Sequence, residues 1–269
     1  MHFQILKSKP KSSTKLAHTS APPRAHGKRT RGRTQVSGKT AKHKMSGAAL
    51  DALPPIARDM ASTDWRKRHA ALQRLTDLVV DHPAVAQEQV FKITDHFLTG
   101  IGDGNSKVNV CALESLCRVV PVMGNLTARV LHQLVPPLCK CLGSSNNNTK
   151  KRSQQAVEAI VNNVTVKDTT LALSKGLATH CKSVSAKSII LEELAGLVID
   201  CQRDHPRLVM NKLLPQAVKL LTGTARDVRV QAEALVTAIC KAGPEQATLK
   251  IQQLSPRSKS RAMVLANAL

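Results

Sequence analysis

Aromatic residues are scarce in this sequence, which contains no tyrosine, one tryptophan and three phenylalanines among 269 residues. Strands draw on these residue types, whereas alanine, leucine, lysine and glutamine favour helices. Hydrophobic residues nevertheless make up 42% of the chain, an ordinary share for a protein that folds. The composition therefore argues against a β-sheet and predicts an all-α fold.

Acidic residues are absent from residues 1–45, a segment that holds twelve lysines and arginines. Serine, threonine, glycine and proline make up much of the rest, and few of these side chains can offset the entropy lost on ordering the backbone. We therefore predict a disordered basic arm over residues 1–45 and a folded domain over residues 46–269. The net charge of +22 predicts a polyanionic partner, for which nucleic acid, an anionic membrane surface and the acidic face of a microtubule all qualify.

Long hydrophobic runs are also missing, and no run approaches the ~20 residues of a membrane span. We therefore expect no membrane span, and among the polyanionic partners we expect a protein surface and no membrane. The basic N-terminus loosely resembles a mitochondrial transit peptide, but its apolar residues are too few for a convincing amphipathic helix.

The seven cysteines are odd in number and irregularly spaced, unlike a secreted disulfide scaffold. Cys139 and Cys141 have no partner pair of the kind that a zinc site needs. Most of the cysteines have aliphatic neighbours within helical patterns. We therefore expect reduced thiols packed in the core of a cytosolic protein.

Five segments carry apolar residues at the i, i+3, i+4, i+7 spacing of amphipathic helices. The stripes run over residues 72–79, 108–119, 157–164, 190–198 and 228–239. A short polar segment rich in Gly, Ser, Thr, Asp or Asn precedes each stripe, as expected where one helix ends and the next is capped. The corresponding anchor residues recur roughly every 40 residues, close to the period of HEAT and armadillo repeats. These anchors are Trp65, Lys107, Lys150, Lys187 and Arg226.

This period predicts an α-solenoid of about six helical hairpins, the last formed by residues 244–254 and 256–269. The turns of one type then lie along one edge of the stack. Each of the five turns contains at least one cation, and the first also contains Trp65, the only tryptophan. Cations at a helix N-terminus oppose the macrodipole, so their recurrence indicates a use in binding. Alternatively, each cation is simply solvated, and Trp65 packs on the preceding helix near Ile56 or Met60.

Three motifs carry a resemblance to a known family. Residues 64–72 (DWRKRHAAL) resemble the opening repeat of TOG domains, the tubulin-binding modules of CLASP, crescerin and Stu-type microtubule regulators. Residues 102–108 (GDGNSKV) are similar to the turn of the second repeat, and residues 254–259 (LSPRSK) to the close of a CLASP or crescerin TOG domain. The resemblance covers about residues 47–269.

The resemblance implies a site as well as a fold. In TOG domains the intra-repeat turns bind tubulin, with the first-turn tryptophan on β-tubulin, basic residues on acidic patches, and the last turns directed toward α-tubulin. Carried over, the resemblance implies a tubulin-binding set of Trp65, Arg66, Lys67, Lys107, Val108, Lys150, Lys151, Arg152, Lys187, Arg226 and Arg229. Trp65 would be the apolar anchor, and Lys187, Arg226 and Arg229 would lie at the far end.

The predicted function is thus that of a non-enzymatic, monomeric microtubule-associated protein without a cofactor, on the cytoplasmic cytoskeleton or in a cilium or flagellar axoneme. Gly102 and Gly104 lack the rest of a nucleotide-binding fingerprint, and no His, Cys and carboxylate set recurs at helical spacing. Two alternatives stay open. One is a nucleic-acid-binding HEAT protein whose arm contacts phosphates, although stacking platforms need more aromatics. The other is a generic scaffold that grips a peptide on its concave face.

Overall fold

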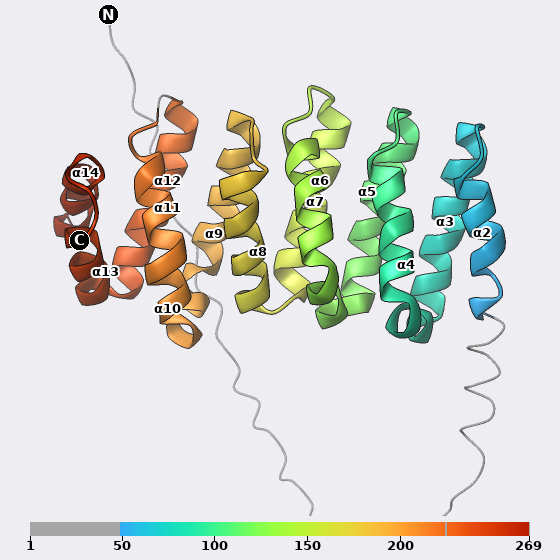
Figure 1. The fold of residues 1–269 in the computed structure, drawn as a ribbon, viewed down its shortest axis with the longest axis horizontal. Coiled ribbons are helices and arrows are strands. Elements are labelled where there is room, and N and C mark those ends of the chain that lie inside the picture. The colour runs from blue at the N-terminus through green and yellow to red at the C-terminus, as the bar shows by residue number, and fades with distance from the viewer. Residues whose placement is uncertain (1–48, 224, 269) are drawn as a thin grey trace, which may run out of the picture. The chain divides into compact units, whose positions relative to one another are not determined.

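The computed structural model describes residues 49–223 and 225–268, with the side chains of residues 257 and 258 not described. The basic arm predicted for residues 1–45 lies outside the described residues. Within them the chain folds into antiparallel helix pairs that follow one another in a row, so the all-α solenoid of about six hairpins is confirmed (Figure 1).

The first three hairpins are formed by residues 53–163. They comprise α2 (Leu53–Met60) with α3 (Trp65–Asp81), α4 (Pro83–Ile101) with α5 (Ser106–Met123), and α6 (Leu131–Leu142) with α7 (Asn147–Asn163). A 3-10 segment, η1 (Gly124–Val130), leads into α6.

The last three hairpins follow the same plan. In the fourth hairpin, α8 (Val166–Thr179) pairs with α9 (Val184–Asp204). In the fifth, α12 (Arg226–Ala242) pairs with a first helix made of three consecutive segments, α10 (Pro206–Leu208), η2 (Val209–Leu213) and α11 (Leu214–Leu220). In the sixth, α13 (Pro244–Gln252) pairs with α14 (Pro256–Asn267). The final pair agrees closely with the hairpin predicted from the sequence.

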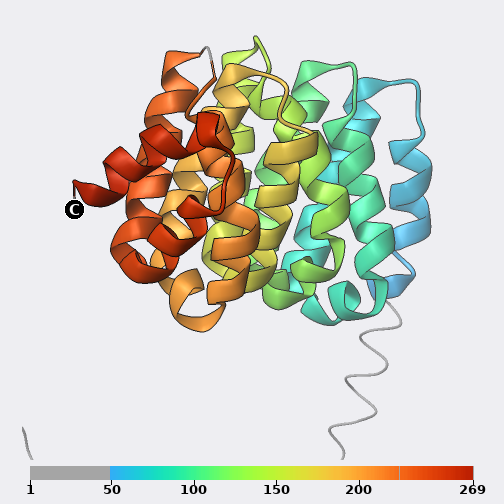
Figure 2. The same cartoon turned by 60° about the vertical axis from the view of Figure 1, so that its left-hand side comes forward.

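Two layers result from this order. The second helices of successive hairpins, α3, α5, α7, α9, α12 and α14, pack side by side, and the first helices form the other layer. The turns inside the first five hairpins lie along one edge, the upper edge in Figure 1, and they remain together when the view is turned in Figure 2. The predicted alignment of these turns along one edge is therefore confirmed.

Side-chain caps fix where most second helices begin. Asp64, Asn105, Asn146 and Ser183 each accept a hydrogen bond from a backbone N–H in the first turn of α3, α5, α7 and α9. Ala225 stands at the same place before α12 and makes no such bond. The polar segments before the stripes therefore do act as helix caps at four of these five turns, because they satisfy N–H groups that a helix start leaves unpaired.

The apolar stripes form the core. Leu72, Leu75 and Val79 of α3 are fully buried, as are the corresponding residues of the other striped helices, with few exceptions.

The segment Ser106–Leu142 is apolar and long enough to suggest a membrane span, but it is divided among α5, η1 and α6 and half of its apolar window is buried. Core helices of soluble proteins are often as long and as apolar, so packing in the core accounts for the apolar character of this segment. All seven cysteines are free, and all except the half-buried Cys117 are buried, as predicted.

Gly100 lies where α4 crosses the second layer. A Cβ added at Gly100 would come within 2.8 Å of the Ala112 Cβ and 2.9 Å of a Leu72 methyl carbon. We expect Gly100→Val to lower the free energy of unfolding by about 1–3 kcal/mol, because overpacking forces neighbouring side chains to shift. Denaturant unfolding of both proteins measures the change.

Gly196 provides the matched control for this substitution. It also lies inside a helix, α9, but is exposed and has no atom within 4 Å of a built Cβ. Gly196→Ala should be neutral or stabilise by about 0.5–1 kcal/mol through helix propensity. Equal effects of the two substitutions would contradict the close crossing at Gly100.

Glu193 creates a pH dependence in the second layer. Partial burial, with Glu158 of α7 and Glu192 nearby, raises the pKa of Glu193 to about 6. The charged form is therefore disfavoured in the folded state, and its destabilising effect grows as pH rises from the unfolded-state pKa toward 6. Glu193→Gln should raise the thermal unfolding midpoint at pH 7.5 and leave it nearly unchanged at pH 4.5. The exposed Glu192 should give a smaller gain when changed to Gln, and identical Glu193→Gln effects at both pH values would refute the assignment.

Candidate binding edge along the hairpin turns

Trp65 occupies the first position of α3, directly after the turn between α2 and α3. The Asp64 carboxylate accepts a hydrogen bond of 2.9 Å from the Arg66 N–H, and the Ser62 hydroxyl accepts one of 3.2 Å from the Asp64 N–H. These bonds set the backbone that carries the indole. Trp65 is half-buried and packs against the core, so its ring is neither sealed inside nor fully exposed. It therefore packs against the core and also leaves part of its surface accessible at the edge.

Two cations lie over the indole. The Nζ of Lys107 is 4.8 Å from the ring centroid of Trp65, and the guanidinium carbon of Arg66 is 5.1 Å from it. Both distances are typical of cation–π contacts. Lys107 comes from the second position of α5, in the next hairpin. The first two turns thus share one aromatic–cation cluster, which we call the Trp65 cluster: Trp65, Arg66 and Lys107.

A bidentate ion pair holds these two turns together. Arg68 donates from Nε to one carboxylate oxygen of Asp103 at 2.6 Å and from Nη2 to the other at 2.9 Å. Its Nη1 also donates to the carbonyl oxygens of Ser62 and Thr63 at 2.9 and 3.0 Å. The exposed fractions of the two side chains, 18% for Arg68 and 8% for Asp103, show that the pair is largely withdrawn from water.

Asp103 extends this clamp to the second helix start. One of its oxygens accepts a 2.8 Å hydrogen bond from the N–H of Asn105, the residue that caps α5. The hydrogen bond from Arg68 lowers the pKa of Asp103, against the opposing effect of burial. A continuous path of hydrogen bonds therefore links the first turn to the cap of the helix that carries Lys107. In the sequence Arg68 looked like one more cation of the edge, and its structural role was missed.

The third turn supplies an exposed cation and a paired one. Lys151 is exposed and Lys150 is half-buried at the start of α7. Arg152 makes a 2.8 Å ion pair with Glu114 of α5 and donates a 2.9 Å hydrogen bond to Gln155. Arg152 thus joins two helices of the second layer, while Lys151 is directed to solvent.

The far end of the edge also has both an exposed cation and cations that are half-buried or hydrogen-bonded within the domain. Arg226 is exposed at the first position of α12, and Lys187 is half-buried in the first turn of α9. Arg229 donates a 2.9 Å hydrogen bond from Nη1 to the carbonyl oxygen of Gly223, six residues earlier. Arg68 makes the equivalent bond to Ser62, also six residues earlier. Arg229 therefore stabilises its own turn.

Val108 requires a correction. Its side chain has 0% exposure and belongs to the core, so it cannot contact a partner on this edge. The physical reason is its position, because Val108 is the first member of the apolar stripe of α5 and faces inward with Ala112. The anchors also differ in position: Lys107 is the second residue of its helix, whereas Lys150 and Lys187 are the fourth of theirs. The cations share an edge but not a single structural position.

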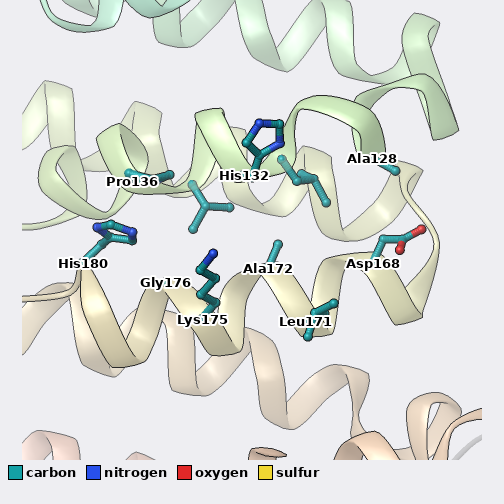
Figure 3. Close-up of a pocket in the computed structure, with 11 residues that line it drawn as sticks. Ala128, His132, Pro136, Asp168, Leu171, Ala172, Lys175, Gly176 and His180 are labelled. Atoms are coloured by element: carbon teal, nitrogen blue, oxygen red, sulfur yellow. The ribbon is translucent and has the colours of Figure 1, made fainter.

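The first layer has a separate cavity between α6 and α8, of about 250 Å³ (Figure 3). Its walls include Val135 and Ala172, with His132, Lys175 and His180 among the polar groups. This volume is below the usual range of ligand pockets. Among residues 49–223 and 225–268, no group of three or more His, Cys, Asp or Glu is placed to hold a metal ion.

The protein is thus an α-solenoid of HEAT-like hairpins whose turns form a row along one edge. The family model of the XMAP215/Dis1/CLASP TOG domain matches residues 52–259, and the chain belongs to this family. The resemblance found in the sequence is therefore confirmed.

Two curated relatives share part of the sequence. Human "TOG array regulator of axonemal microtubules protein 1" is 25% identical over 154 residues, which is 56% of this chain and 9% of the relative. "Crescerin-like protein che-12" of Caenorhabditis elegans is 24% identical over 183 residues, 65% of this chain and 14% of the relative. The chain thus spans only a small part of the length of these relatives.

Solved structures agree on the fold. Drosophila melanogaster Mini spindles TOG3 has a TM-score of 0.59 at 15% identity, covering 80% of this chain and 93% of that one. A crescerin structure has a TM-score of 0.61 at 12% identity, covering 80% and 88%. At such low identity, the likeness supports the fold alone.

Proposed function

We propose that this chain is a non-enzymatic tubulin-binding module that regulates or decorates microtubules through its edge of hairpin turns. The observation that carries the proposal is the Trp65 cluster, in which the only tryptophan and cations from two successive hairpins meet at the edge. Tryptophan and arginine are the residues most enriched at binding hot spots. Membership of the TOG family supports tubulin as the partner.

The relatives support a microtubule role. One is named as a regulator of axonemal microtubules, and crescerin uses a TOG domain array to regulate microtubules in the primary cilium. A further similar structure concerns the specificity of TOG–tubulin binding. We therefore propose that the chain acts on the cytoplasmic cytoskeleton, with the microtubules of a cilium or flagellar axoneme as a candidate location.

The exposed cations give the edge its expected charge. Arg66, Lys67, Lys107, Lys151 and Arg226 are exposed along it. Cations held at a surface steer an acidic partner and accelerate association more than they raise affinity. The tubulin surface is such a partner. Trp65 would then supply affinity on β-tubulin, and the later turns would set the orientation toward α-tubulin.

In this proposal the paired and half-buried cations contribute less to tubulin binding than the exposed ones. Arg152 and Arg229 already bond Glu114 and Gly223, so they would have to exchange partners to reach tubulin. Lys150 and Lys187 are half-buried and contribute mainly charge. Val108 is left out because it is buried.

The basic residues of the segment 1–45 supply a second attachment in this proposal. Twelve cations and no acids make electrostatic attraction to a microtubule lattice strong at low salt. Linking a folded binding domain to such a segment raises the effective concentration of each at the lattice.

Removing residues 1–45 should separate the two contributions. Residues 46–269 should still co-elute with free tubulin in gel filtration, because the edge is intact. Co-sedimentation with microtubules should weaken several-fold at about 0.01 M salt, where the Debye length is about 30 Å, and much less at about 0.15 M, where it is about 8 Å.

The comparison of the full chain with residues 46–269 also tests the competing functions. Binding by the full chain, with none by residues 46–269, would contradict the proposal and favour a nonspecific polycation. Retention of nucleic acid but not tubulin by the full chain would favour the nucleic-acid alternative.

A further inference from the structure

Cys139 and Cys181 are in direct contact although 42 residues separate them in the sequence. Their Sγ atoms are 3.1 Å apart, and the exposed fractions of the two residues are 2% and 5%. Cys139 lies near the end of α6, in the third hairpin, and Cys181 lies in the turn between α8 and α9, in the fourth. The pair therefore connects two successive hairpins.

The glycine beside them makes the contact possible. A Cβ built on Gly176 would come within 2.5 Å of a Val135 methyl carbon and 3.2 Å of the Cys139 Sγ. Any side chain at this position of α8 would therefore push α8 away from α6. The backbone N–H of Cys181 also bonds the Gly176 carbonyl at 3.0 Å, which holds the second thiol at the end of α8.

We propose that Cys139 and Cys181 are an oxidative modification site, which reacts with a hydroperoxide to form a reversible disulfide between the third and fourth hairpins. A disulfide has an S–S length of about 2.05 Å, so the two sulfurs need to approach by roughly 1 Å. Cys181 lies in a turn, ahead of the Ser183 cap of α9. Its side chain can therefore rotate without breaking a helix.

The contact between the thiols brings an attacking sulfur and a second thiol that can resolve the product together. The Cys181 thiol donates to the Cys139 sulfur, which lowers the pKa of Cys139 and raises that of Cys181. The thiolate is the nucleophile of cysteine chemistry. Cys139 is therefore taken as the attacking thiol, and the overall reaction is the same if the two roles are exchanged.

The two steps balance. The Cys139 thiolate attacks one oxygen of the hydroperoxide, the O–O bond breaks, and the products are a sulfenic acid on Cys139 and an alcohol, or water from hydrogen peroxide. The Cys181 sulfur then attacks the sulfenic sulfur, the S–O bond breaks, and water leaves with the thiol proton. In total, two thiols and one hydroperoxide give one disulfide, one alcohol and one water. A dithiol reductant reverses the product by exchange.

The surroundings single out this pair. Cys141, two residues along α6, has its sulfur 3.8 Å from the Asn109 amide nitrogen instead of facing a thiol. Cys111 contacts the carbonyl oxygen of His69. Gly176 also lines the cavity in Figure 3, and a Cβ built on it would lie 3.2 Å from the Cys139 Sγ, so the cavity lies beside the thiol pair. A cavity of about 250 Å³ is ample for hydrogen peroxide.

The test is disulfide mapping on the full chain. Reduced protein is treated with hydrogen peroxide, the free thiols are alkylated, and peptides are analysed by mass spectrometry without reduction. We expect one linked peptide pair containing Cys139 and Cys181, and its loss after dithiothreitol. The oxidised protein should also unfold at a midpoint higher by roughly 5–10 °C, because the bond closes a long loop.

Three serine variants sharpen the result. Cys139→Ser and Cys181→Ser should each abolish the linked pair, whereas Cys141→Ser, which removes the other cysteine of α6, should retain it. Should either variant fail to fold, the map of the wild-type chain decides. The proposal is overturned if Cys139 and Cys181 are still free thiols, and so become alkylated, after peroxide has oxidised the more accessible Cys117, or if either forms its bond with another cysteine.

Discussion

Replacing Trp65 with alanine should weaken binding to αβ-tubulin by about 30-fold or more, equivalent to about 2 kcal/mol. The substitution removes the only tryptophan, the large apolar surface at the start of the edge. It also removes the ring over which Lys107 and Arg66 are held, at 4.8 and 5.1 Å. The two cations would then be less ordered before binding, so the cost of fixing them would rise. A titration of labelled tubulin followed by anisotropy gives the Kd of each variant.

Phe91 provides a matched control for this experiment. It is an exposed aromatic residue in the middle of α4, and the guanidinium carbon of Arg129 lies 5.0 Å from its ring centroid. Phe91→Ala therefore removes the same kind of aromatic–cation contact away from the turns. Its tubulin affinity should match the wild type. A folded Trp65→Ala protein with wild-type affinity would show that the edge assignment is wrong.

The sequence was sufficient to predict the fold because the solenoid repeats one local rule. Each second helix has an apolar stripe, and each stripe follows a polar segment, so the order of hairpins follows from periodicity alone. Caps such as Asn105 and Asn146 are local interactions, formed with N–H groups two or three residues ahead. Local rules of this kind are readable from a single sequence.

The candidate site was only partly predictable, because the direction of a side chain depends on the neighbouring hairpin. Val108 follows Lys107 directly, yet Val108 is buried and Lys107 lies over Trp65. Arg68 and Lys67 are adjacent cations, but only Arg68 meets a carboxylate 35 residues away. Cys139 and Cys181 also meet through packing of separate hairpins. No pattern in the sequence indicates which of several similar residues will have such a distant partner.

Replacing Arg68 with alanine should lower both stability and tubulin affinity, although Arg68 is not placed as a contact. The change leaves Asp103 without its cation and frees the carbonyl oxygens of Ser62 and Thr63. Removing one partner of a largely buried pair is costly, because the other charge stays desolvated. We expect the thermal unfolding midpoint to fall by roughly 5–10 °C. Tubulin affinity should fall severalfold, since the two turns that form the Trp65 cluster lose their clamp.

Fluorescence separates this positioning role from direct contact. Trp65 is the only tryptophan, so emission of the free protein reports on the first turn alone, and Arg68→Ala should shift it before tubulin is added. Arg118→Ala is the matched control, because Arg118 pairs with Asp77 at 3.0 Å but both side chains are more than half exposed. Exposed pairs contribute little, so this variant should leave the midpoint, the emission and the affinity unchanged.

Arg68→Lys keeps the charge but not the planar fork of the guanidinium, and should recover only part of the loss in midpoint and in affinity. Unaltered emission together with weakened binding would instead assign Arg68 to the tubulin contact itself, since a displaced turn must change the surroundings of the indole.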